Sequence, residues 1–240
     1  MRIVASCAAL VAAGLAFCGV DVARAESAAE TDAHVLLFSG FDLWRGGSFA
    51  NGGLLYSPDG LSRDGFTLKL MLGAGTYRYM SGTTEISGRQ YVASFLPGWR
   101  FKQDGLEVTV FAGTDVQQHN LSPDDLGNRL RGFNVGMRGG FDLWFEPVPA
   151  AMMLTASLSA STIGMNLWAR AAAGVRTFDL VWLGPEAIAC GDENYRQFRF
   201  GLHATGLRTD AFEWSLGAGW GTDNDHRSGP YGRIGVLMRR

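Results

Sequence analysis

The sequence predicts an all-β protein, a single antiparallel transmembrane β-barrel of about twelve strands, and three observations support this prediction. Apolar residues alternate with small or polar residues along segments that recur from residue 34 to the end of the chain. The connections between these segments are short and long in alternation, as in bacterial outer-membrane barrels. The chain also begins with the features of an export signal.

The first 25 residues have the features of a cleavable secretory signal peptide. Arg2 precedes an apolar run at 3–20, and small residues at the ends of 23–25 occupy the two positions that a signal peptidase reads. We therefore predict cleavage after this tripeptide. The remaining chain would consist of a short polar segment at 26–33 and a barrel domain at 34–240.

Composition and charge exclude several classes of protein. Cleavage removes Arg2, Arg24 and Asp21, so the formal net charge changes from −2 to −3, and this balance gives no reason to expect a nucleic-acid partner. Cys190 is the one cysteine after the signal, so no disulfide framework can form. No later stretch approaches the roughly 18 apolar residues of a membrane helix. We expect no metal ion and no cofactor.

The clearest alternation lies in residues 133–145. Its odd positions are apolar or glycine, and its even positions carry small or charged residues, with Trp144 as the exception. The other candidate strands are 34–43, 48–57, 65–80, 88–102, 106–114, 154–161, 167–177, 181–191, 196–205, 212–221 and 231–239.

The polar face of these segments distinguishes a membrane barrel from a soluble β-sandwich, which also alternates. A soluble sheet would carry many Lys, Glu, Asp and Thr side chains on this face. Here the face is mostly Gly, Ser and Asn with isolated charges, which suits a narrow interior. Most candidate strands also approach the roughly 9–11 residues of a tilted membrane strand, whereas soluble strands average about 5–6.

The connections favour an even number of strands. If the N-terminus lies on the periplasmic side, the even-numbered connections should be short, and the odd-numbered ones should include the longer segments. The short candidates start at 57 or lie at 103–105, 147–149, around 179 and at 209–210, and the long ones lie at 81–88, 119–129 and 222–230.

Charged residues on the polar face are candidates for the barrel lumen. In a confined interior an unpaired charge is costly, so basic and acidic groups should pair across strands. A lumen plugged by such pairs and a polar lumen that passes solute are both consistent with this pattern. Pro185 removes a ladder donor beside one of them and predicts a bulge or a strand end. The candidates are Arg138, Asp142, Arg170, Arg176, Glu186, Arg199, His203 and Glu213.

Two tryptophans are candidates for stacking on sugar rings. Trp144 and Trp168 point inward by strand parity, beside Arg138 and Arg170. Most other Trp and Tyr residues lie near candidate strand ends, where membrane-interface belts explain them.

His119, Ser122, Asp124 and Asp125 fall in a predicted outer loop. A hydrolase would need the histidine and a nucleophile at hydrogen-bond distance, and a calcium site would need several converging oxygens. A polar turn is the simpler interpretation, and recognition of a glycan or partner by His119, Asp124 and Asp125 is the alternative. His203 and the hydroxyl two residues later loosely match the His-x-Ser pair of outer-membrane lipases, but here both would point into the barrel.

Several segments resemble the BcsS family, whose members are encoded with bacterial cellulose synthase operons. The resemblance is carried by FSGFDLWRGGSFANGGLLYSPDGLSRDGF at 38–66, GAGTYRY at 73–79, AGTDVQQHNLSPDDLGNRLRG at 112–132, LGPEA at 183–187 and GDENYRQFRFGLH at 191–203. These segments spread over almost all of the chain after the signal. None is a known catalytic signature, so the resemblance implies an accessory role in cellulose biosynthesis or export at the outer envelope.

We therefore expect a non-enzymatic outer-membrane accessory of cellulose biosynthesis with a structural or partner-binding role. Its expected contacts are outer-membrane lipid, with subunits of the cellulose synthase complex or glucan as candidate partners. Two alternatives remain open. One is a narrow channel that passes glucan or small oligosaccharides, and the other is a barrel-embedded hydrolase or acyl-transfer enzyme.

Overall fold

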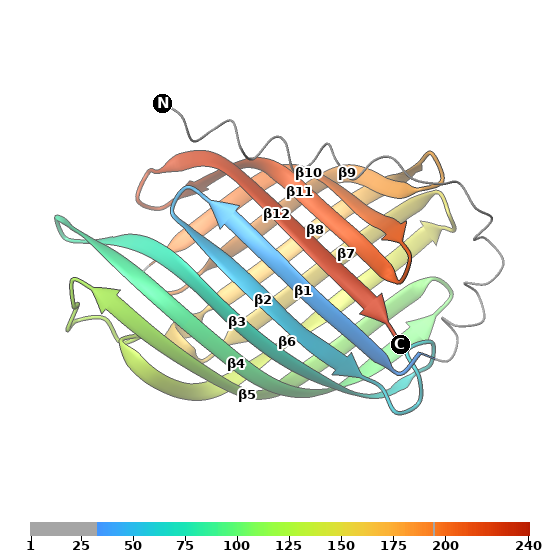
Figure 1. The fold of residues 1–240 in the computed structure, drawn as a ribbon, viewed down its shortest axis with the longest axis horizontal. Helices are drawn as coiled ribbons and strands as arrows, with labels where there is room; N and C mark the ends of the chain where they lie inside the picture. Colours follow the sequence, from blue (N-terminus) through green and yellow to red (C-terminus); the bar gives the residue numbers. More distant parts are fainter. Residues whose placement is uncertain (1–32, 194) are drawn as a thin grey trace.

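A computed structural model describes residues 33–193 and 195–240 of the chain. The predicted signal peptide at 1–25 lies outside the described residues, as does the polar segment at 26–33 except for its last residue. The described chain forms a closed barrel of twelve strands, each bonded to its two neighbours in sequence order (Figure 1). All pairs are antiparallel, so the predicted twelve-strand antiparallel barrel is confirmed.

The strands follow the alternating segments closely. A short 3-10 helix, η2 (Ile163–Met165), lies between two of them, and no helix in 33–193 or 195–240 has the length and hydropathy to cross a membrane. The strands are β1 (Val35–Trp44), β2 (Gly47–Tyr56), β3 (Gly65–Ser81), β4 (Thr84–Gln103), β5 (Leu106–Ser122), β6 (Gly132–Val148), β7 (Met152–Ser161), β8 (Leu167–Thr177), β9 (Val181–Gly191), β10 (Arg196–Thr209), β11 (Phe212–Asp223) and β12 (Ser228–Arg239).

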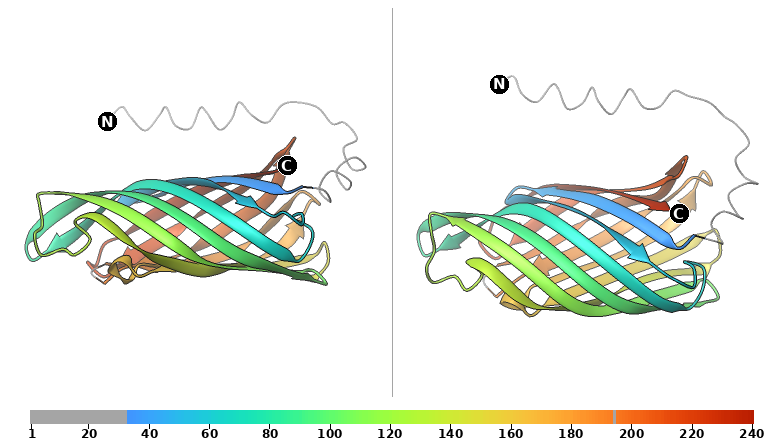
Figure 2. Two further views of the ribbon diagram at one scale, coloured as in Figure 1. Left: turned by 90° about the horizontal axis from the view of Figure 1, so that it is seen from below. Right: turned by 60° about the horizontal axis from the view of Figure 1, so that its bottom comes forward.

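The ring closes between its first and last strands. β1 and β12 pair without interruption from Leu36 opposite Arg239 to Trp44 opposite Tyr231. Both strands therefore begin and end at the same heights, and the described chain starts and finishes at one end of the barrel, on the right of Figure 1. We call this the terminal end and the opposite one the loop end. Figure 2 shows that the barrel is flattened, so that its cross-section is oval.

The wall is taller over β3, β4 and β5 than the sequence predicts. The segment at 81–88 was expected to form a long outer loop, yet Ser81 pairs with Thr84 and the hairpin turns within two residues. Gly82 adopts φ +61°, a left-handed conformation that such a tight turn requires and that glycine takes readily. On the other side β4 pairs with β5 as far as Ser122. These strands therefore extend beyond the rest of the ring at the loop end.

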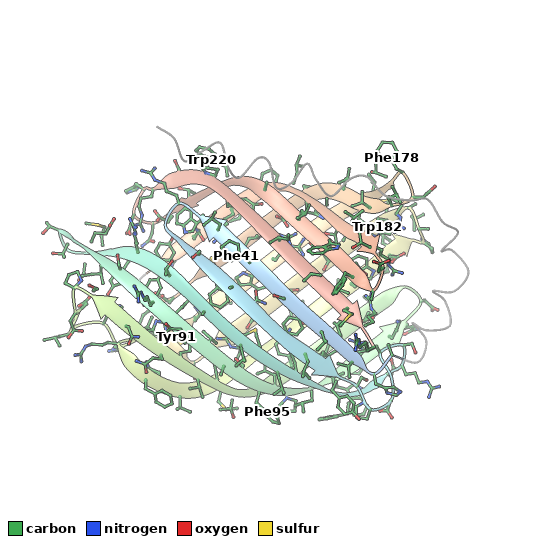
Figure 3. All side chains as sticks on the ribbon, in the orientation of Figure 1. Phe41, Tyr91, Phe95, Phe178, Trp182 and Trp220 are labelled. Carbon is green, nitrogen blue, oxygen red and sulfur yellow. The ribbon has the colours of Figure 1, made fainter. Side chains whose placement is uncertain are left out.

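The outer surface of the barrel is apolar. Along β6, Phe133, Val135 and Met137 are 67%, 64% and 57% exposed, whereas Arg138 on the opposite face is 7% exposed. The stretch that alternates most clearly in the sequence thus separates an apolar outer face from a polar lumen. Among the side chains labelled in Figure 3, Phe41, Tyr91, Phe95 and Trp220 are large and exposed on the outer surface of strands.

Pro185 lies inside β9 with no change of register, so the predicted bulge or strand end is wrong. Arg176 of β8 donates its N–H to Ala151 at 3.0 Å. Backbone groups of successive residues in a strand point to alternate neighbouring strands, so the carbonyl of Ala173 points toward β9. The residue opposite it there is Pro185, which has no N–H to donate. The imidazole of His203 donates from Nε2 to that carbonyl at 3.0 Å instead. The strand continues because a side chain supplies the missing donor.

Replacing His203 by leucine is expected to lower the free energy of unfolding by about 1–3 kcal/mol, because the carbonyl of Ala173 is left without a donor. In a Pro185→Ala background the loss should be smaller, since the alanine supplies a backbone N–H. Urea titration of the protein folded in detergent micelles measures both effects. Equal losses in the two backgrounds would contradict this role of His203.

Candidate functional site

Asp115 of β5 is the centre of a buried hydrogen-bond cluster in one wall of the lumen. Arg138 donates to it from Nε and Nη2 at 3.0 and 2.9 Å. The hydroxyls of Ser94 and Ser161 donate at 2.8 and 2.6 Å, and the amide of Gln117 donates at 2.7 Å. The carboxylate is 0% exposed, so these five hydrogen bonds replace its hydration. The two bonds from Arg138 form the bidentate geometry of strong guanidinium–carboxylate pairs.

Glu186 of β9 organises a second buried cluster in the lumen. Arg170 of the adjacent β8 donates from Nε at 3.0 Å. Arg233 and Tyr231 of β12 donate at 2.9 and 3.0 Å, although β12 lies three strands away in the ring. Two guanidinium groups therefore share one carboxylate. This cluster holds two of the predicted lumen residues, Arg170 and Glu186, and adds Arg233, whose role the sequence did not indicate.

Two further ion pairs join strands that lie three positions apart in the ring. Lys69 of β3 bonds Asp142 of β6 at 2.8 Å, and its ammonium lies 4.4 Å from the ring of Phe111. Arg199 of β10 bonds Asp42 of β1. The predicted residues Asp142 and Arg199 thus both lie in the lumen and have partners of opposite charge.

The other predicted lumen charges lie near the terminal end. Arg176 is stacked over Trp182, with its guanidinium 5.0 Å from the ring centroid, and donates to the carbonyl of Asp179 at 2.9 Å. Glu213 accepts a hydrogen bond from Arg239 at 2.8 Å. These contacts attach the strands to one another around the rim.

Several large side chains lie buried near the terminal end of the barrel. Trp182 and Trp144 meet edge to face, with centroids 6.4 Å apart, and both Trp182 and Met153 are buried. From the connection after β2, Leu61 is also buried, and Arg100 donates to its carbonyl at 2.6 Å. We call these five residues the terminal plug.

A cavity of about 410 Å³ occupies the loop-end half of the lumen, and we call it the loop-end pocket. One wall is aromatic, with Trp44 of β1, Trp168 of β8 and Tyr195. Gln90 of β4 and Gln117 of β5 belong to the other side. The two predicted stacking residues are therefore separated, because Trp168 lines this pocket and Trp144 lies in the terminal plug.

The charged side chains that line the loop-end pocket are balanced. Three are basic and three are acidic, so the described lining carries no net charge. They are Asp42, Lys69, Arg138, Asp142, Asp192 and Arg199.

His119 lies in β5 and not in the outer loop that the sequence predicts. It is 3% exposed and faces the pocket, with Nδ1 2.9 Å from the hydroxyl of Tyr77 and Nε2 2.9 Å from Oε1 of Gln117. The amide nitrogen of Gln117 in turn donates to Asp115. With the amide in this orientation, Nε2 carries the hydrogen and Nδ1 accepts from Tyr77. The period-two run of Asp115, Gln117 and His119 was the signal in the sequence for this extension of β5.

The connection at 123–131 contains the other two loop candidates. Asp124 forms a bidentate pair with Arg131 at 2.5 and 2.7 Å, and this pairing lowers the pKa of the carboxyl. Asp125 accepts a hydrogen bond from Tyr79 at 2.8 Å, which lowers its pKa. Leu130 of the same connection is buried and lines the pocket. Both acids thus hold the connection in place at the loop end.

The lumen histidines are not arranged as in a hydrolase. His119 bonds a tyrosine and a glutamine, and His203 bonds Thr205 at 2.9 Å and a backbone carbonyl. None of these partners is a carboxylate that would orient the imidazole as a base. In the described part of the chain, no group of three or more His, Cys, Asp or Glu side chains is placed to hold a metal ion.

Replacing Asp115 by alanine is expected to lower the free energy of unfolding by about 3–5 kcal/mol, because Arg138 would remain buried without its counter-ion. Urea titration in detergent micelles measures the loss. Asp124→Ala is the matched control: its pair with Arg131 is exposed, so removal should leave the unfolding midpoint unchanged. Similar midpoints for the two variants would contradict the structural role of Asp115.

The chain was compared with known proteins. No curated protein matches it. Among solved structures it is similar to a KdgM porin, with 11% identity and a TM-score of 0.45 over 85% of this chain and 98% of that one. The translocator domain of autotransporter NalP from Neisseria meningitidis has 14% identity and a TM-score of 0.46, over 86% and 88%. The transport unit of AIDA-I from Escherichia coli has 11% identity and a TM-score of 0.46, over 92% and 93%.

One family model matches the chain, and its description is cellulose biosynthesis protein BcsS. The match covers residues 36–240, which include β2 to β12 completely and all of β1 except its first residue. The resemblance found in the sequence is confirmed, and the chain belongs to the BcsS family of cellulose biosynthesis proteins.

Proposed function

We propose that this protein is an outer-membrane barrel that serves cellulose biosynthesis as a closed, non-enzymatic accessory, with a structural or partner-binding role. The family supplies the pathway. The outer face supports the membrane location, since exposed Phe, Leu, Val and Met side chains surround a barrel whose polar and charged groups are turned inward. A closed ring also leaves no strand edge unpaired, as a membrane-spanning sheet requires.

The terminal plug is the observation that supports a closed accessory over a channel. A channel needs a continuous polar path, whereas Trp182, Met153 and Leu61 are buried apolar side chains at the terminal end. In the middle of the lumen, Glu186 of β9 and Arg233 of β12 are bonded to one another. The loop-end pocket therefore serves as a blind recess that holds a ligand or partner.

The closed lumen is tested by recording currents across planar lipid bilayers that contain the refolded protein. No stepwise conductance is expected from the unaltered chain. A variant with both Trp182→Ala and Met153→Ala should leak, because it shortens two side chains of the terminal plug. Before recording, a shift in mobility on denaturing gels after heating verifies that each protein is folded. Sustained single-channel steps from the unaltered protein would contradict the proposal and favour the oligosaccharide channel.

The non-enzymatic role is tested in cells that make cellulose. Deletion of the gene should lower cellulose output, and a chain carrying His119→Gln and Ser122→Ala should restore it as well as the unaltered chain does. The first change keeps a polar side chain in the pocket. The second removes the hydroxyl that is nearest to His119 in the sequence. Loss of output by a variant that is folded in the outer membrane would favour catalysis. An unchanged output in the deletion strain would refute the accessory role.

A further inference from the structure

The loop-end pocket is large enough to hold a small ligand. Its volume of about 410 Å³ falls in the range of roughly 300–1,000 Å³ that is usual for ligand sites. Lys69 also lines the pocket, and its ammonium is 4.4 Å from the Phe111 ring, 5.6 Å from the Phe38 ring and bonded to Asp142.

The charges of the lining favour a neutral ligand. The pocket has equal numbers of acidic and basic side chains, and pairs such as Arg199 with Asp42 and Lys69 with Asp142 neutralise one another in place. A charged ligand would have to break these pairs or bring an uncompensated charge into a confined space. An uncharged polar ligand avoids both costs.

The aromatic wall presents fixed apolar faces. Trp44 and Tyr195 lie 6.5 Å apart, and Trp168 packs against the buried cluster of Trp44, Ile188 and Tyr231. Rings held in this way lose little conformational freedom when a ligand binds. A β-linked glucose ring matches them, because its faces carry C–H groups and its hydroxyls lie at its edge.

The pocket also offers hydrogen-bonding groups for such an edge. Gln90 and Gln117 come from β4 and β5, and β4 lies opposite β10 in the ring, where Gln197 also lines the pocket. The oxygen of Gln197 accepts from Arg199 at 2.9 Å, but its Nε2 is buried without a hydrogen-bond partner in the described structure. Side-chain amides both donate and accept, as hydroxyl groups require.

From these features we infer that the loop-end pocket binds the end of a neutral, β-linked glucan chain. Trp168 stacks on a ring face, while Gln90 and Gln197 bond the hydroxyls at the edge. The inference rests on the proposed function, because a blind pocket holds a chain end where a channel would pass it along.

Isothermal titration of the folded protein in detergent micelles tests the inference. Cellohexaose should bind saturably, α-linked maltohexaose more weakly, and an acidic oligogalacturonate not at all. Trp168→Ala should weaken cellohexaose binding about tenfold or more. Trp220→Ala is the matched control, because this tryptophan is 59% exposed on the outer face and should leave the affinity unchanged.

Gln90→Leu is a second variant that keeps the size of the side chain and removes its amide, which can donate and accept hydrogen bonds. It should also weaken binding, and heat-modified migration verifies that it is folded. Absence of saturable cellohexaose binding, or equal affinities for Trp168→Ala and the unaltered protein, would overturn the inference. A non-conducting barrel that fails to bind sugar would refute the glucan site alone. A conducting barrel that binds it would refute the closed accessory instead.

Discussion

Closure of the ring between β1 and β12 is the constraint on which the rest of the structure depends. Once these strands pair, every strand has two neighbours and no edge is left with unpaired N–H and C=O groups. Closure also gives each strand an inner and an outer face, so every second side chain enters a narrow space. Charged groups in that space lose hydration and need partners. The arrangement of the lumen follows from this need.

Several of these ion pairs join strands that are not neighbours in the strand ladder. Glu186 with Arg233, Asp42 with Arg199 and Lys69 with Asp142 each join strands three positions apart in the ring. Such pairs require walls that come close together, which agrees with the oval cross-section in Figure 2. They connect distant strands without passing through the backbone ladder, and truncating one member leaves the other charge buried and unpaired.

The two ends of the lumen therefore have different characters. At the terminal end, tryptophan, methionine and leucine side chains are packed and buried. At the loop end, taller strands and the connection at 123–131 enclose a pocket with aromatic and amide walls. Both lumen histidines have structural roles. His119 connects Tyr77 to Gln117 through hydrogen bonds. His203 supplies the hydrogen-bond donor that Pro185 lacks.

Sequence periodicity determined the strand number, the antiparallel order and the face of residues such as Arg138 and Glu186, because side chains in a strand alternate strictly. It did not determine what lies opposite each residue. Trp144 and Trp168 share a parity, yet one packs in the terminal plug and the other lines the pocket. The height of a side chain along the barrel, and the side chains that it meets in the lumen, depend on the register, tilt and flattening of the whole ring. Those properties arise only when all twelve strands are assembled, and they decide which charges meet and where a cavity remains.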